Sequence, residues 1–182
     1  MIQSPNKYYF STTEVVDWQH PKVFATAQPL ASDVATQAQL ARACQHWVRD
    51  NIVQCSADSV AAVSCNASDV LQSGLGSSFS SSHLLAALLR ANGLASSFCY
   101  QRKQDTKGVF KLHGYCAVWL TDSGWYPLEV STVAQQPIRY HLGECHYRLY
   151  SYAPLPEIVR ALQQSVSWAA AEQALPSRIS MG

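Results

Sequence analysis

The chain has 182 residues, of which 48% are hydrophobic and 14% are charged, and its formal net charge is +1. A chain of this length can bury a full core, and we expect one domain over residues 1–182. Because the few basic residues are scattered and balanced by acidic ones, nucleic acid and membrane surfaces are not expected partners. No apolar run reaches the ~20 residues that a transmembrane helix needs.

Six cysteines are spread along the chain without a C-x-x-C pair: Cys44, Cys55, Cys65, Cys99, Cys116 and Cys145. This spacing is typical of reduced thiols rather than of a disulfide framework. The polar start of the chain lacks the apolar stretch of a secretory signal, so we expect a cytoplasmic protein. The spacing also argues against a zinc site, and we expect no metal and no cofactor.

Helical patterns dominate the first half of the chain. A turn before Pro21 predicts a helix that begins near this proline. Ser32 and Asp33 offer N-caps to a second helix, which we expect from about Asp33 to Asn51 because apolar residues recur there at helical spacing. The segment Val53 to Asn66 has no firm period and is expected to be irregular.

The most apolar helix follows a glycine-broken, serine-dense segment. One short helical turn is expected over Ala67 to Gln72, before that segment. The helix itself includes His83 to Ala91 and is apolar nearly all round, which predicts that it is buried. Gly93 is expected to end it, because glycine readily adopts the left-handed conformation that follows many helices.

The second half predicts mostly strands. Four are expected: Ala95 to Gln101, Leu112 to Leu120, Trp125 to Val130 and roughly Tyr147 to Tyr152. Gly124 lies in the turn between the second and third, where a positive φ is expected. An amphipathic helix is expected from Pro156 to about Ala174, with Val166 on its apolar face, so residues 147–175 form a C-terminal strand and helix. Helices followed by strands predict an α+β fold.

Seven segments together carry a family resemblance: 17–21 (DWQHP), 47–52 (WVRDNI), 67–71 (ASDVL), 81–93 (SSHLLAALLRANG), 98–101 (FCYQ), 112–115 (LHGY) and 125–129 (WYPLE). Over about residues 8–132 the chain resembles bacterial transglutaminase-like proteins of the cysteine-peptidase type. The resemblance implies a papain-like core in which the buried helix packs on an antiparallel sheet. In such proteins a cysteine begins this helix, a histidine lies on a following strand, and an acidic residue, usually aspartate, comes from the next strand.

The resemblance places the cysteine position at Ser78, the histidine at His113 and the acid at Glu129. Glutamate keeps the role of aspartate, because either carboxylate can orient an imidazole and stabilise its charged form. A helix N-terminus lowers the pKa of a thiol, whereas a serine hydroxyl gains far less. Three explanations of Ser78 stay open: a cysteine replaced by serine in this chain, a natural inactive homologue, or a serine activated by His113.

The implied activity is acyl transfer from a peptide, amide or ester substrate, to water in hydrolysis or to an amine in transamidation. We expect little turnover from the chain with Ser78. The alternative is a non-catalytic binding module that keeps the cleft of the family. The acyl donor, the acceptor and the oligomeric state stay open at this point.

Each site residue also has a structural explanation. Ser78 can be a plain helix N-cap, which is the commonest role of a serine before a helix. His113 can be a hydrogen-bonded strand histidine, and Glu129 an ordinary charged strand residue. Among the thiols, Cys99 is the one that could lie near the site, since Cys116 should alternate to the strand face opposite His113.

The hairpin tests whether His113 and Glu129 can touch. A three-residue loop formed by residues 122–124 puts both on one face of the sheet, because side chains alternate along a strand. With this loop, however, His113 and Glu129 are offset by about 13 Å along the strands. A different register, or a break in the pleat near Pro127, is therefore expected to bring them together.

Overall fold

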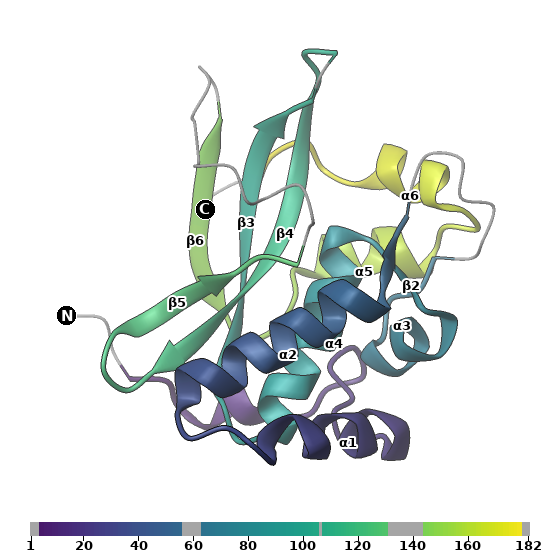
Figure 1. The fold of residues 1–182 in the computed structure, drawn as a ribbon. Coiled ribbons are helices and arrows are strands. Elements are labelled where there is room, and N and C mark those ends of the chain that lie inside the picture. The colour runs from purple at the N-terminus through teal and green to yellow at the C-terminus, as the bar shows by residue number, and fades with distance from the viewer. Residues whose placement is uncertain (1–3, 56–62, 106, 131–143, 180–182) are drawn as a thin grey trace.

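The structure is a computed structural model and describes residues 4–55, 63–105, 107–130 and 144–179. A four-stranded sheet in the order β5-β4-β3-β6 forms one layer, and helices α1 to α6 lie to one side of it (Figure 1). Every neighbouring pair in this sheet is antiparallel. The predicted α+β fold is therefore confirmed. In the described part of the chain, no helix is long and apolar enough to cross a membrane.

The bounds of the elements are as follows. The helices are α1 (Pro21–Ala27), α2 (Gln37–Asn51), α3 (Ala67–Ser73), α4 (Ser78–Ala91), α5 (Pro156–Gln163) and α6 (Trp168–Ala174). The strands are β1 (Val53–Gln54), β2 (Leu75–Gly76), β3 (Ser96–Gln104), β4 (Phe110–Leu120), β5 (Gly124–Leu128) and β6 (Cys145–Ser151). Short 3-10 turns cover Lys7–Phe10 and Gln28–Ala31.

Helix α4 is the centre of the core, as its apolar sequence predicted. Every residue from Phe79 to Arg90 is buried. The helix packs against β4, and α1, α2 and α3 pack around it (Figure 1). Gly93 follows the helix with a φ of +74°, which a residue with a Cβ would adopt only with strain. The predicted end of the helix is confirmed.

The start of α2 differs from the prediction. The helix begins at Gln37, and its N-cap is Thr36, whose hydroxyl accepts a hydrogen bond from the Gln39 backbone N–H. The Gln39 side chain accepts from the Thr36 backbone N–H in return, so both ends of a capping box are present. Ser32 and Asp33 are not its caps, because the helix begins four residues after Asp33. Ser32 instead ends the Gln28–Ala31 turn, where its backbone N–H donates to the Pro29 carbonyl oxygen.

Two further segments depart from the sequence-based expectations. The segment from Val53 to Asn66 was expected to be irregular, but it begins with the short strand β1, which pairs in parallel with β2 apart from the main sheet. Residues 56–62 of this segment lie outside the described ranges. The expected C-terminal helix is two helices, α5 and α6. Ser167 caps α6 by accepting a hydrogen bond from Ala170 N, and Val166, in the break, is 85% exposed rather than on an apolar face.

Candidate active site

Ser78 is the first residue of α4 and lies within its first turn, as predicted. The N-cap of this helix is Ser77, whose hydroxyl accepts from the Ser80 backbone N–H, so the explanation of Ser78 as a plain N-cap is wrong. Ser78 is half-buried, whereas Phe79 after it is buried. Position 78 therefore presents a side chain where unpaired helical N–H groups and the helix dipole favour negative charge.

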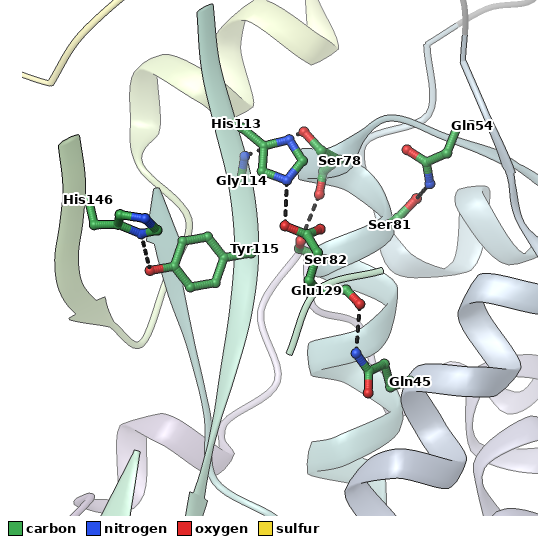
Figure 2. Close-up of polar contacts among 10 residues, drawn as sticks. All are labelled: Gln45, Gln54, Ser78, Ser81, Ser82, His113, Gly114, Tyr115, Glu129 and His146. Carbon is green, nitrogen blue, oxygen red and sulfur yellow. Dashed lines mark hydrogen bonds and ion pairs between the residues drawn. The ribbon is translucent and has the colours of Figure 1, made fainter. Parts of the chain in front are cut away.

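His113 on β4 contacts the carboxylate of Glu129, which follows β5. The distance from His113 Nε2 to Glu129 Oε2 is 2.7 Å, and the two side chains are 19% and 23% exposed. Figure 2 shows the imidazole between Glu129 and Ser78, with its other nitrogen, Nδ1, facing the Ser78 hydroxyl. An ionised carboxylate only accepts hydrogen bonds, so Nε2–H donates to Glu129 and Nδ1 is left as the basic nitrogen.

The register of the hairpin explains this contact. Leu120 pairs with Gly124 and Cys116 with Leu128, so the loop is formed by residues 121–123 and not by residues 122–124. Continuing the pairing by one residue places Glu129 opposite Tyr115, two residues from His113. His113 and Glu129 therefore lie on the same face of the sheet, as expected. Their offset along the strands is about 7 Å instead of the expected distance of about 13 Å. Long side chains reach across such a diagonal pair.

Helix α2 holds Glu129 from a second side, which the sequence did not predict. Gln45 Nε2 donates a hydrogen bond to the Glu129 carbonyl oxygen at 2.6 Å (Figure 2). Leu128 and Val130, on either side of Glu129, are each only 1% exposed. No local signal marks Gln45, because it lies 84 residues away in the sequence. The packing of both neighbours and this bond together position the carboxylate toward His113.

Gly114 allows β4 to lie directly against the start of α4. Its backbone N–H donates to Ser78 Oγ at 3.4 Å (Figure 2). A Cβ at this position would lie 2.7 Å from Phe79 Cδ1 and 3.3 Å from Phe79 Cα, which is closer than packed carbon atoms approach. Glycine at position 114 is therefore required to keep His113 close to position 78.

We expect Gly114→Ala to lower the free energy of unfolding by about 1–3 kcal/mol, the usual cost of forcing a methyl group into a packed contact. Urea denaturation measures it. Gly114→Ala combined with Phe79→Ala should cost less than the sum of the two single changes, because alanine has no Cδ1 for the new methyl group to meet. An unchanged stability of the Gly114→Ala protein would show that β4 does not need this close approach.

The buried cysteines do not replace Ser78. None of the six cysteines forms a disulfide bond, and Cys44, Cys65, Cys99 and Cys116 are buried. Burial raises the pKa of the Cys44 and Cys65 thiols to about 12 and raises that of Cys116 as well, so these thiols are protonated at neutral pH. Cys99 packs in a small cluster with Tyr115 and Ala117 on the sheet, and not in the cavity beside Ser78.

A cavity of about 460 Å³ opens beside Ser78 and His113. The end of β3 and the residue after it border the cavity through Lys103, Gln104 and Asp105. The C-terminal part of the chain, for which the sequence suggested no role, contributes another side of the cavity. These lining residues are Trp168, Glu172, Leu175, Pro176 and Ser177. Within the described residues, no three histidine, cysteine or acidic side chains are grouped as metal ligands.

Comparison with known proteins agrees with this architecture. Residues 25–130 match the sequence profile of the transglutaminase-like superfamily, and the chain belongs to this superfamily. A candidate cysteine protease from Cytophaga hutchinsonii has a similar structure, with a TM-score of 0.57 and 14% sequence identity over 68% of this chain and 41% of that chain. A candidate protease from Parabacteroides distasonis gives a TM-score of 0.49 and 16% identity over 65% of this chain and 25% of that chain.

The chain thus spans less than half of the length of either matched structure. It matches no curated protein. The fold is therefore that of the transglutaminase-like superfamily, and the catalytic roles of Ser78, His113 and Glu129 stay predictions.

Proposed function

We propose that this chain is an acyl-transfer scaffold in which position 78 is the nucleophile position, His113 is the general base and Glu129 orients His113. The observation that carries the proposal is the 2.7 Å contact between His113 Nε2 and Glu129 Oε2, with Nδ1 facing the first residue of α4 (Figure 2). Nucleophile, base and orienting group in this order form the recurring unit of acyl transfer. The substrate class is a peptide, another amide or an ester.

With a cysteine at position 78, each residue has a defined step. The thiol proton moves to His113 Nδ1, and the thiolate attacks the carbonyl carbon. Backbone N–H groups at the start of α4 stabilise the oxyanion that forms. The His113 imidazolium then gives its proton to the leaving amine or alcohol, and the acyl group stays on sulfur. Water or an amine then attacks this thioester and loses a proton to His113. The carbon–sulfur bond breaks, which releases the product and restores the thiolate at position 78.

Ser78 makes the chain with its present sequence a poor catalyst. A serine hydroxyl needs a hydrogen bond to its base before it can react. Within the described residues, the Ser78 hydroxyl oxygen accepts from Gly114 N at 3.4 Å, and no hydrogen bond joins it to His113. This observation favours a replaced cysteine or an inactive homologue over a working serine.

The same serine is the observation that supports a second candidate function, a binding module that keeps the cavity without the chemistry. In the binding-module alternative, the His113–Glu129 pair is a remnant of the catalytic unit. The localisation that we propose is the cytoplasm, since none of the six cysteines forms a disulfide bond.

The decisive experiment is peptide-resolved alkylation of the Ser78→Cys protein with limiting iodoacetamide at pH 6. An ordinary thiol of pKa ~8.5 is almost wholly protonated there, whereas the helix N-terminus and His113 should make the introduced thiol largely thiolate. Because a thiolate of lower pKa is also a weaker nucleophile, we expect a net advantage of about tenfold.

The reference is an ordinary exposed thiol introduced by Ser123→Cys in the β4–β5 turn. Equal rates for the two introduced thiols, in folded and in mildly loosened protein, would contradict the proposal and favour the binding module. Turnover of an activated ester by the Ser78→Cys protein provides the second readout.

A further inference from the structure

The cavity beside Ser78 has the size of a ligand site. Its volume is about 460 Å³, within the roughly 300–1,000 Å³ that small-molecule and side-chain sites occupy. It lies next to the position that would attack a carbonyl, because both Ser78 and His113 line it. A substrate whose carbonyl lies at position 78 could therefore place the side chain next to that carbonyl in this cavity.

The lining of the cavity is mostly apolar. Its apolar residues come from the start of α4, from β4 and the turn before it, and from the C-terminal segment: Phe79, Val109, Phe110, Leu112, Trp168, Leu175 and Pro176. Val109 is 53% exposed although it is hydrophobic. Covering such a side chain with an apolar group is favourable, because it removes both surfaces from water.

The charged residues of the lining do not select a charged ligand. Lys103 and Lys111 are balanced by Asp105 and Glu172, so the lining has no net charge. Lys111 Nζ contacts Glu172 Oε1 at 2.9 Å and Asp105 Oδ2 at 3.5 Å, which engages three of the four charges with one another. The Lys111–Glu172 pair also joins β4 to α6.

We propose that this cavity binds a large apolar side chain, preferably an aromatic one, next to the scissile carbonyl of the acyl donor. The substrate class is then an amide or peptide with phenylalanine, tyrosine, leucine or a similar residue at that position. Trp168 and Val109 are the selecting residues, one from α6 and one from the turn before β4. The inference rests on the proposed function, since it assigns position 78 as the point of attack.

The test uses chloromethyl ketones that share one warhead and differ only in side chain: N-acetyl-phenylalanyl, N-acetyl-glycyl and N-acetyl-glutamyl. The introduced thiolate of the Ser78→Cys protein displaces chloride, forming a carbon–sulfur bond, and mass spectrometry measures the second-order rate. We expect the phenylalanyl probe to react about tenfold to a hundredfold faster than the glycyl probe, as apolar pockets discriminate by such factors. The glutamyl probe should be no faster than the glycyl probe.

Two substitutions in the Ser78→Cys protein assign the preference to the cavity. Trp168→Ala removes the indole ring that lines the cavity. Val109→Glu adds a charge to the lining at an exposed position, where folding is not at risk. Each should reduce the phenylalanyl preference at least fivefold. Tyr126→Ala is the matched control: this aromatic residue is 45% exposed on β5 and does not line the cavity. It should leave the preference unchanged.

Iodoacetamide separates the two levels of the proposal, because it is too small to need the cavity. Fast labelling by iodoacetamide with equal rates for the three ketones, or a phenylalanyl preference that survives both Trp168→Ala and Val109→Glu, would overturn the subsite and leave the proposed function standing. Slow labelling by every reagent would instead overturn the proposed function. If Trp168→Ala does not fold, the Val109→Glu result decides.

Discussion

In the Ser78→Cys protein, the further change His113→Ala is expected to slow alkylation of the introduced thiol at pH 6 about tenfold and to move the midpoint of its pH–rate profile upward by about two units. The reason is the loss of the imidazolium that pairs with the thiolate, which leaves only the helix N-terminus to lower the thiol pKa. The gain in intrinsic nucleophilicity at higher pKa keeps the change in rate smaller than the change in thiolate fraction.

The control for this prediction is a histidine outside the site. His146 on β6 contacts the Tyr115 hydroxyl at 3.4 Å and lies apart from Ser78, on the other side of Tyr115 in Figure 2, so His146→Ala should leave the profile in place. Glu129→Gln should give a smaller upward shift than His113→Ala, because it removes the carboxylate that stabilises the imidazolium but keeps the base. An unchanged midpoint after His113→Ala would exclude His113 as the base.

Arg90→Met is expected to lower the free energy of unfolding by about 3 kcal/mol or more. Arg90 is only 2% exposed at the end of α4. Its guanidinium donates to the carbonyl oxygens of Ser11, Ser96 and Tyr152 at 2.8, 3.0 and 2.6 Å. It thereby joins the N-terminal segment, β3 and the chain after β6. Methionine fills similar space but leaves these three acceptors without their donor.

Burial lowers the pKa of Arg90 to about 10, so the guanidinium is still charged at neutral pH. Arg90→Lys should recover less than half of the loss, because an ammonium group does not reproduce the planar fork of donors. Arg49→Met on α2 is the matched control, since within the described residues Arg49 pairs only with its exposed neighbour Asp50, and such surface pairs contribute little to stability. Urea denaturation of the three proteins gives the comparison. A loss of under 1 kcal/mol for Arg90→Met would contradict the assigned role.

The parts of the structure that could be predicted from the sequence depend on local chemistry. The apolar run before Asn92 predicted a buried helix, and Gly93 predicted its end, because helix burial and left-handed glycines are local properties. The turn between β4 and β5 was predicted from Gly124, because a positive φ is also a local property, and Gly124 has a φ of +76°. The order of helices and strands was enough to predict the α+β class.

The helix boundaries that were wrong reflect competition between neighbouring caps. Ser32, Asp33 and Thr36 can all cap a helix, and Thr36 is the cap because Gln39 completes a capping box with it. Likewise, Val166 fits the period of a continuous C-terminal helix, but Ser167 starts a new helix after it. Periodicity identifies helices well and their ends poorly, since several residues near each end offer similar hydrogen bonds.

The candidate site was only half determined by the sequence. Its chemistry was predicted from Ser78, His113 and Glu129, and strand alternation predicted that the last two share a face. Tertiary structure decided the distance between them, because a shift of the hairpin loop by one position changed their offset along the strands by two residues. Tertiary structure also decided the hydrogen bond from Gln45 to Glu129 and the C-terminal side of the cavity, which includes Trp168. Both depend on how segments that are distant in the sequence pack together, which no local sequence pattern can predict.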